Sequence, residues 1–281
     1  MAQTIFDAIV SEAQLANGWL RVKRNKGMGG SDDISLADFE NHLAANLKAL
    51  RMALLYGSYR PSRLLQFAIA KPSGGRRPLA VPTVLDRVAQ AAASAVLDGI
   101  LDPLMSEGSF AYRRARSVQH AIGRVVTYRL GGFDWLVDGD IERFFETVPH
   151  PRLEVDLAGH VPCAKTLRLI GLWLAGFSPG GIGLAQGSPI SPLLANLYLT
   201  PVDHTIHSKR VKLVRFGDDF LLMTRTRGAA DWAHLRMAGL LAERGLRLNE
   251  AKTAVRPFAE AVQFLGYSFT ADGRHVVRAA R

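Results

Sequence analysis

The chain has 281 residues, of which 48% are hydrophobic, so it can bury a sizeable core in one large domain or two small ones. Its 35 lysines and arginines outnumber its 25 aspartates and glutamates, and the net charge of +10 favours a polyanionic partner, most simply nucleic acid. The single cysteine, Cys163, excludes an internal disulfide and a cysteine-based zinc site. We expect a cytoplasmic protein without a membrane partner, because no signal peptide or membrane-spanning stretch is present.

The N-terminal part of the chain is predicted to be helical. Residues 1–30 are expected to form a lead-in that ends in a flexible, glycine-rich loop, and residues 31–281 to form the main domain. A helix is predicted over residues 38–56, because leucines and a phenylalanine recur on one helical face.

A β-hairpin and a capped helix are predicted next. Residues 65–70 and 78–82 are typical of two strands joined by a basic turn at 71–77. Thr83, with Asp86 three positions later, is typical of the start of a helix, which is expected to extend to about residue 100.

The C-terminal half mixes short strands with helices. Strands are predicted at 136–141, 246–249 and 263–269, and an amphipathic helix at 229–244. Another helix is expected to open at Ser191, with a kink or an early stop at Pro201. The absence of repeats and long linkers favours one α+β body.

Two adjacent acids, Asp218 and Asp219, lie between two short apolar runs. The runs predict strands, and the Gly-Asp-Asp sequence between them predicts a tight turn. Two neighbouring carboxylates repel each other unless a cation lies between them. A solvated turn is the plain alternative, since glycine and aspartate are common turn residues.

A third acid makes the metal hypothesis stronger. Asp140 ends an apolar run, and a strand end carrying an acid beside the Gly-Asp-Asp turn could hold two divalent ions for in-line phosphoryl transfer. Asp138 remains a competing candidate, because alternation along a strand places it on the same face as Asp140.

Two loops are further candidates for ligand contact. Residues 183–192 contain glycines and prolines that can bring the backbone close to a ligand, although such a loop can also simply lead into a helix. The basic turn at 71–77 could cover phosphates, although it could equally be a solvated hairpin tip.

In this order the sequence blocks resemble reverse transcriptases of the prokaryotic, group II intron-like kind, over about residues 25–270. The blocks that carry the resemblance are Lys71…Arg77-Pro78-Leu79-Ala80-Val81-Pro82-Thr83, Ser109-Phe110-Ala111-Tyr112-Arg113, Asp140…Phe144-Phe145, Gln186-Gly187-Ser188-Pro189, Phe216-Gly217-Asp218-Asp219, Leu248-Asn249…Lys252-Thr253 and Phe264-Leu265-Gly266-Tyr267.

The resemblance implies a fold and an activity. It implies the fingers and palm of a right-hand polymerase, with fingers at about 31–130 and a palm at about 131–270 whose antiparallel sheet is flanked by helices. The chain ends soon after Phe269, so a thumb is expected to be absent or minimal. The implied activity is RNA-directed DNA polymerisation, in which dNTPs are added to a DNA or RNA primer on an RNA template.

The resemblance also implies the chemistry of the active site. Asp140, Asp218 and Asp219 would bind Mg²⁺, with Mn²⁺ as a substitute. Lys252 would be the general acid for pyrophosphate, although a lysine near a triphosphate can be only a counter-charge.

Further residues would contact the substrates. Lys71 and Arg77 would contact the incoming triphosphate, Gln186 the nucleotide or the template, and Phe145 would be the steric gate against a 2′-hydroxyl. The primer grip would comprise Phe264, Leu265, Gly266 and Tyr267. Four positions depart from the family pattern without removing a metal ligand: Ala115, Ala185, Phe216 and Gly217.

The Phe-Ala-Tyr-Arg block and the compact length resemble most the reverse transcriptases linked to CRISPR spacer acquisition. This subtype implies a CRISPR integrase subunit, or another protein that supplies a thumb, as the partner. Two alternatives remain: a weakly active or inactive nucleic-acid-binding subunit of a larger complex, and a truncated group II intron-encoded protein.

Overall fold

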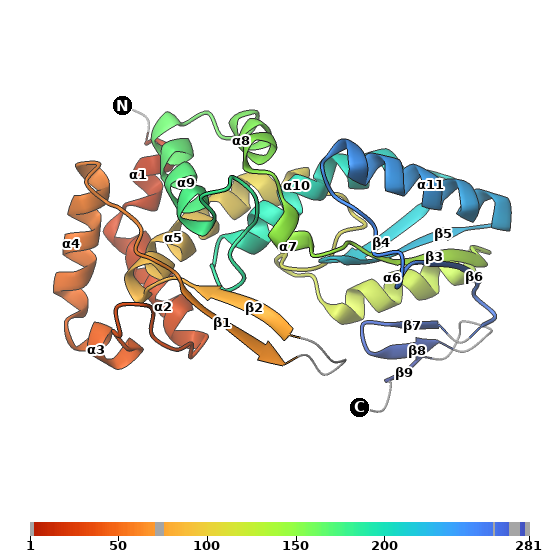
Figure 1. The fold of residues 1–281 in the computed structure, drawn as a ribbon, viewed down its shortest axis with the longest axis horizontal. Helices are drawn as coiled ribbons and strands as arrows, with labels where there is room; N and C mark the ends of the chain where they lie inside the picture. Colours follow the sequence, from red (N-terminus) through yellow and green to blue (C-terminus); the bar gives the residue numbers. More distant parts are fainter. Residues whose placement is uncertain (1–2, 71–75, 261, 270–275, 279–281) are drawn as a thin grey trace. The chain divides into compact units, whose positions relative to one another are not determined.

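The computed structural model describes residues 3–70, 76–260, 262–269 and 276–278 (Figure 1). The chain divides into two compact units, each assembled from two separate stretches of sequence. The first unit contains Met1–Pro103 and Phe145–Leu197, and the second contains Leu104–Phe144 and Tyr198–Arg281. The predicted boundaries of the lead-in, the fingers and the palm stay a prediction. Each boundary was drawn for one continuous stretch of sequence, whereas each unit combines two stretches.

The N-terminal part of the first unit is helical. Its helices are α1 (Ile5–Ile9), α2 (Glu12–Arg24), α3 (Leu36–Asn41), α4 (Leu43–Leu55) and α5 (Val84–Leu101). The single helix predicted at 38–56 is wrong, because His42 leaves the helical conformation (φ −121°, ψ 27°) and separates α3 from α4. The start predicted at Thr83 is confirmed, since its hydroxyl accepts a hydrogen bond from the Asp86 amide.

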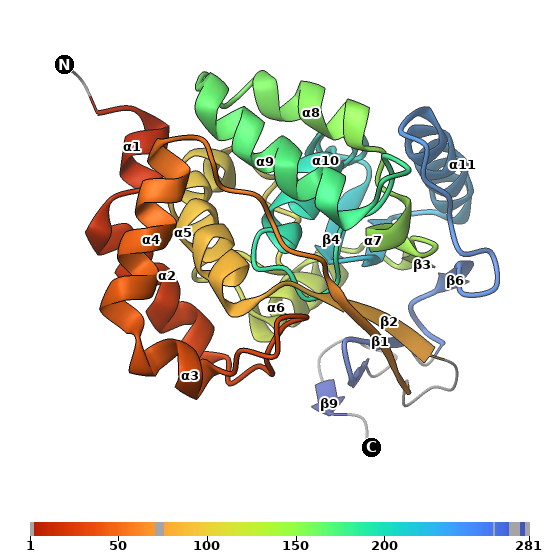
Figure 2. The same ribbon diagram turned by 60° about the vertical axis from the view of Figure 1, so that its left-hand side comes forward.

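The remaining elements of this unit are a hairpin and helices from the second stretch of sequence. Strands β1 (Leu65–Ala70) and β2 (Arg76–Val81) pair antiparallel and extend away from α2 and α5 (Figure 2). Helices α8 (His150–Ala158) and α9 (Ala164–Phe177) follow the short helix α7 (Phe144–Thr147).

A buried polar cluster joins three segments of the first unit. The hydroxyl of Tyr59 donates to Asp86 Oδ1 at 2.5 Å and accepts from Trp173 Nε1 at 2.9 Å. Asp86 Oδ2 accepts from Thr83 Oγ1 at 2.8 Å and from the Ser62 amide at 3.0 Å. Asp86 is 1% exposed, and burial raises the pKa of its carboxyl against the effect of these donors.

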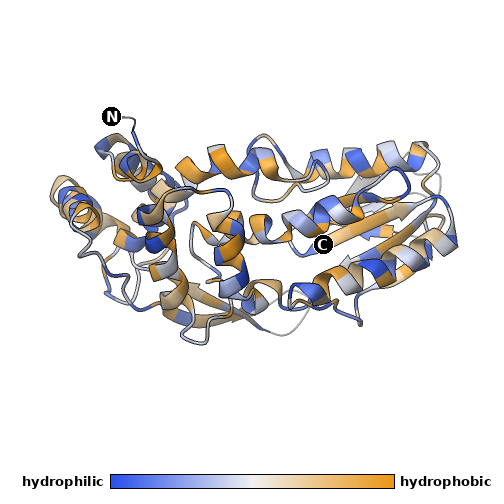
Figure 3. Ribbon diagram, turned by 90° about the horizontal axis from the view of Figure 1, so that it is seen from above, coloured by the Kyte–Doolittle hydropathy of each residue, from blue (hydrophilic) through white to orange (hydrophobic). Residues whose placement is uncertain are grey.

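The second unit is built on a four-stranded antiparallel sheet in the order β4-β5-β3-β6. The strands are β3 (Trp135–Asp140), β4 (Lys212–Phe216), β5 (Asp219–Thr224) and β6 (Ala254–Pro257). Figure 3 shows these strands as largely hydrophobic, which fits a sheet covered on both faces. The predicted α+β class, with an antiparallel sheet flanked by helices, is confirmed.

Helices and a small second sheet cover the four strands. Helix α11 (Arg227–Glu243) packs on β3, β5 and β6, while α6 (Val118–Leu130) and β4 are in contact (Figure 1). The three-stranded sheet of β7 (Val262–Phe264), β8 (Tyr267–Phe269) and β9 (Val276–Arg278) shares one buried cluster with α6 and the large sheet.

One glycine of the large sheet is required by close packing. A Cβ atom on Gly139 would lie 2.4 Å from the ring of Phe220, its cross-strand neighbour on β5. The fully buried Phe220 ring therefore lies directly over β3, between the two positions that carry Asp138 and Asp140.

Two local predictions in the C-terminal half are wrong. Residues 246–249 form an isolated bridge, in which Leu248 pairs with Ile141, and the strand at that edge of the sheet is β6 instead. Helix α10 (Ser191–Ile206) opens at Ser191 as predicted but continues past Pro201 for five further residues, so the early stop is wrong, while the alternative of a kink at Pro201 stays a prediction. Within the described ranges, no helix combines the length and apolar character needed to cross a membrane.

Candidate active site

Three acids meet at one end of the large sheet in the second unit. Gly217 adopts a left-handed conformation (φ 74°) that closes the turn between β4 and β5, so that Asp218 and Asp219 follow directly. Asp219, the first residue of β5, is the register partner of Asp140, the last residue of β3. The amide of Ile141 donates to the Asp218 carbonyl at 3.1 Å and ties the turn to β3.

Asp140 is held by the segment that follows α11. Its Oδ1 accepts from Asn249 Nδ2 at 3.1 Å, and its Oδ2 accepts from Lys252 Nζ at 3.0 Å. The Asn249 amide also donates to the Asp140 carbonyl at 2.8 Å. Asn249 was not assigned a role from the sequence, although it stands in the block that contains Lys252.

Asp138 lies in a different environment. Burial raises the pKa of its carboxyl, and the ion pair that it forms with Arg256 on β6 only partly opposes this effect. Asp140, in contrast, lies opposite Asp219 and contacts Lys252. Periodicity left the two aspartates equivalent, and the register of the sheet separates them.

The acids at the sheet end are electrostatically coupled. Desolvation, followed by the negative charges of Asp218 and Asp140, raises the pKa of Asp219 to about 6, while the Lys252 ammonium lowers it. The hydrogen bond to Asp140 is the largest cause of the raised pKa of Lys252, which keeps this side chain protonated at neutral pH. The ammonium therefore supplies positive charge where the three carboxylates need it.

The donor set suits a hard divalent cation, because carboxylate oxygens are the preferred ligands of Mg²⁺. Burial is the largest cause of the raised pKa of Asp219, and the repulsion from Asp218 and Asp140 adds to it. In the described part of the chain, no group of three or more His, Cys, Asp or Glu side chains is placed so that it could by itself hold a metal ion. The chemistry of the three carboxylates suits such an ion, and the strand register brings Asp140 and Asp219 to opposite positions.

The raised pKa of Asp219 predicts a pH-dependent stability. Its folded-state pKa of about 6 exceeds the ordinary aspartate value of about 3.9 in an unfolded chain. The stability that it contributes is therefore full below about pH 4 and is lost as the pH rises towards 6. Asp219→Asn is expected to raise the Tm of the metal-free protein at pH 7.5 and to leave it nearly unchanged at pH 4. A similar rise at both pH values, or one shared by the α11 control Asp231→Asn, would contradict this.

Two predicted nucleotide-binding residues lie in the first unit. Phe145 is half-buried in α7, and its carbonyl accepts from the Leu184 amide at 2.6 Å. The carbonyl of Gln186 accepts from the Ala80 amide at 2.9 Å, so the loop of residues 183–192 lies along β2. Lys71 and the side chain of Arg77 lie outside the described residues.

The predicted primer grip is a tight hairpin in the second unit. Leu265 (φ 52°) and Gly266 (φ 79°) form the turn between β7 and β8, and Phe264 pairs with Tyr267 across it. Phe264 is 4% exposed and belongs to the core, whereas Leu265 and Tyr267 are only partly buried against it. The hairpin therefore presents these two side chains, and not Phe264, at its surface.

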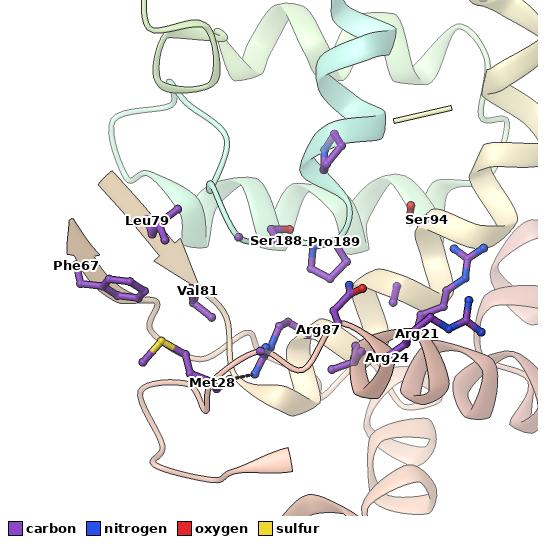
Figure 4. Close-up of a pocket in the computed structure, with 16 residues that line it drawn as sticks. Arg21, Arg24, Met28, Phe67, Leu79, Val81, Arg87, Ser94, Ser188 and Pro189 are labelled. Atoms are coloured by element: carbon purple, nitrogen blue, oxygen red, sulfur yellow. Dashed lines mark hydrogen bonds between the residues drawn. The ribbon is translucent and has the colours of Figure 1, made fainter. Parts of the chain in front are cut away.

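A basic cavity in the first unit was not predicted from the sequence. It has a volume of about 760 Å³. Figure 4 shows Arg21 and Arg24 from α2 at one side, and Phe67, Leu79 and Val81 from the hairpin at the other. Its walls come from α2, the hairpin, α5 and the loop of residues 187–192, which are far apart in sequence.

Arg87 of α5 is the buried cation of this cavity, at 6% exposure. Its Nη2 donates to the Met28 carbonyl, and its Nε has no hydrogen-bond partner among the described residues. Burial lowers the pKa of the guanidinium, and Asp32 partly opposes this effect. A buried cation with an unused donor favours an anionic ligand in the cavity.

Two acids on a β-hairpin turn, opposite a third acid at the end of a middle strand, define the palm of a nucleic-acid polymerase. The reverse transcriptase (RNA-dependent DNA polymerase) family profile matches residues 69–269. The chain belongs to this family, and the resemblance seen in its motifs is confirmed.

Two relatives are similar to this chain over most of its length. Protein YkfC of Escherichia coli is 28% identical over 287 residues, covering 85% of this chain and 74% of that protein. The group II intron-encoded protein LtrA of Lactococcus lactis is 30% identical over 177 residues, covering 60% of this chain and 29% of LtrA.

Solved structures show the same fold. A chain of a partial Cas6-RT-Cas1–Cas2 complex is 28% identical, with a TM-score of 0.51, and the match covers 80% of this chain and 39% of that one. Telomerase from Candida tropicalis, at 14% identity, has a TM-score of 0.59 over 84% of this chain and 60% of that one, and indicates the fold alone. The match thus spans less than half of LtrA and less than half of the similar chain in the Cas6-RT-Cas1–Cas2 complex.

Proposed function

We propose that this protein is an RNA-directed DNA polymerase that adds dNTPs to the 3′ end of a primer. The observation that carries the proposal is the pairing of Asp140 with Asp219, beside Asp218, at one end of the sheet. When bound there, Mg²⁺ or Mn²⁺ ions would activate the primer hydroxyl and stabilise charge on the leaving pyrophosphate.

The chain's own groups prepare this site in three ways. The β-hairpin and β3 fix the carboxylates before substrate arrives, so little reorganisation is needed. Asn249 and Lys252 orient the Asp140 carboxylate through both of its oxygens. The protonated, solvent-accessible Lys252 would supply a proton to the departing pyrophosphate.

Primer extension tests the proposal directly. Purified protein is incubated with poly(rA)/oligo(dT), Mg²⁺ and dTTP, and the products are separated by length. Extension on the RNA template is the expected result. The alternative function, a nucleic-acid-binding subunit without polymerase activity, would give template binding without extension under Mg²⁺ or Mn²⁺, and that result would reject the proposal.

Phe145 is proposed to exclude ribonucleotides. It stands five residues after Asp140 in the chain, and a ring beneath the sugar would clash with a 2′-hydroxyl. Phe145→Val is expected to admit rNTPs while dNTP use partly survives. The measurement is the ratio of dNTP to rNTP incorporation by wild type and variant. An unchanged ratio would place the gate elsewhere, and neighbouring Phe144→Val is the matched comparison.

The basic cavity of the first unit is proposed to bind the single-stranded template. Arginines on one side and apolar side chains on the other suit phosphates and flat bases, respectively. Binding through phosphates should be insensitive to sequence and should weaken steeply with salt.

We also propose a role in CRISPR spacer acquisition from RNA, with an integrase subunit as partner. The support is the 28% identity to a chain of the Cas6-RT-Cas1–Cas2 complex, together with the sequence blocks quoted above. A partner that closes over the template–primer duplex should slow its dissociation and lengthen the products.

The measurement is product length after a single encounter, with a trap for released enzyme, with and without the candidate integrase. Long products from the isolated chain at physiological salt, unchanged by the integrase, would contradict the partner role. The polymerase proposal would stand in that case.

A further inference from the structure

A fully buried ion pair lies directly behind the Gly-Asp-Asp turn. Arg215, on β4, and Asp203, in α10, are both 0% exposed. The Arg215 guanidinium donates from Nη2 to Asp203 Oδ2 at 2.6 Å and from Nε to both carboxylate oxygens, at 2.9 and 3.1 Å. This is the fork geometry in which an arginine binds a carboxylate most strongly.

The same guanidinium contacts the turn and a second loop. Its Nη1 donates to the Gly217 carbonyl at 3.0 Å, one residue before Asp218. Its Nη2 donates to Ser109 Oγ at 2.9 Å. The Arg215 backbone extends the connection, because its amide donates to Gly108 at 2.7 Å and its carbonyl accepts from Phe110 at 2.9 Å.

The loop bound by Arg215 is conformationally strained. Tyr112 (φ 61°) and Ala115 (φ 55°) both adopt left-handed conformations, which cost energy for residues other than glycine. Arg113 and Arg116 hold the loop by donating to the Ser109 carbonyl at 3.0 and 3.1 Å.

This strained loop also reaches the turn. A Cβ atom on Gly217 would lie 3.7 Å from the Tyr112 hydroxyl, so the exposed Tyr112 ring is beside the turn.

Burial of a charged pair is a poor route to stability, since apolar residues of similar volume often serve as well or better. A role in positioning the turn explains the pair better. Besides binding Asp203, the Arg215 guanidinium donates to the Gly217 carbonyl in the turn and to Ser109 in the strained loop. We propose that Arg215 is a positioning residue. Held by Asp203, it fixes the Gly217 carbonyl and hence the direction of the Asp218 and Asp219 carboxylates, and it couples them to the Tyr112 loop.

This inference rests on the proposed function for its kinetic consequence. Displacement of catalytic groups by about 1 Å can cost on the order of 10²-fold in rate. Loss of the guanidinium should therefore lower kcat without a matching change in the KM for dNTP. It should also weaken divalent-ion binding by the free protein, which needs no substrate.

The main test replaces both charges, in Asp203→Leu/Arg215→Met, so that no unpaired buried charge remains. The control is Asp134→Leu/Arg129→Met, which removes a more exposed Arg–Asp pair of the same unit. Arg215→Lys is the second variant, because it keeps a cation beside Asp203 but lacks the planar fork that reaches Gly217.

Three readouts are compared: Tm, kcat and KM in primer extension, and Mn²⁺ affinity of the free protein by electron paramagnetic resonance. We expect the double variant and Arg215→Lys to fold, with kcat lowered about 10²-fold at similar KM. Mn²⁺ affinity is expected to fall at least about tenfold. Hydrogen exchange at residues 216–220 should accelerate, and the control should match wild type.

Folded variants with wild-type kcat and Mn²⁺ affinity would overturn the proposal. Failure of both Arg215 variants to fold would also overturn it, because the pair would then serve stability. If wild type itself does not extend a primer, the polymerase function fails, while Mn²⁺ affinity and hydrogen exchange still decide whether Arg215 positions the turn.

Discussion

Asp218→Ala is expected to reduce primer extension by about 10³-fold or more. Asp218 follows the Gly217 turn directly and adjoins Asp219, which is paired with Asp140, so its carboxylate is a proposed ligand of the catalytic ions. Divalent ions stabilise the transition state of phosphoryl transfer by several kcal/mol, and each 1.4 kcal/mol corresponds to roughly tenfold in rate. The measurement is the single-turnover rate of dTTP addition on poly(rA)/oligo(dT).

The fold of this variant should survive, because removal of one clustered acid relieves repulsion. Asp231→Ala is the matched control, since Asp231 is an exposed acid on α11 of the same unit. Circular dichroism and Tm should match wild type for both proteins. Near-normal extension by Asp218→Ala would reject the assignment of Asp218 as a metal ligand.

Asp86→Ala is expected to destabilise the first unit by about 3–5 kcal/mol, because an unsatisfied buried polar group costs about 1–3 kcal/mol and three donors lose their acceptor. The substitution leaves the donors of Tyr59, Thr83 and Ser62 without their acceptor in a buried site, and each unsatisfied group adds its own cost. Thermal unfolding of the isolated protein should show a fall in Tm of roughly 6–20 °C.

Tyr59→Phe removes one of these donors and the acceptor of Trp173 Nε1, and should cost less, about 1–2 kcal/mol. Template binding and extension, measured well below the Tm of each variant, should remain near wild type. An equal fall in Tm for the two variants would indicate that the Tyr59 hydroxyl, and not the Asp86 carboxyl, holds the cluster together.

Features that depend on neighbouring residues were predictable from the sequence. The cap at Thr83 and the Gly-Asp-Asp turn each require only a few adjacent side chains. Helices α8 and α9 have no counterpart among the predicted elements, and neither begins with a side-chain cap, so the usual start signal is missing. The break between α3 and α4 could not be predicted from the sequence either, because the helical spacing of the leucines continues across His42.

The candidate site also contains some features that local sequence predicts and others that it does not. The sequence motifs identified the candidate acids. The choice of Asp140 over Asp138 depended on two tertiary contacts: Asp140 pairs with Asp219 on β5, and Asp138 forms an ion pair with Arg256 on β6. The basic cavity combines four segments that are distant in sequence. In the sequence alone, nothing distinguishes Arg87 from an ordinary residue of helix α5. Such features depend on tertiary contacts, which local patterns do not encode.

The strand order has a consequence for synthesis on the ribosome. Strand β3 leaves the ribosome early, yet both of its neighbours, β5 and β6, belong to the stretch that begins at Tyr198. Both edges of β3 therefore stay unpaired during synthesis until the ribosome has passed Leu197, the last residue of the first unit, and has made β5 and β6. An apolar strand with open edges is a target for aggregation. Nascent chains that stall between residues 144 and 219 should consequently depend most on chaperones.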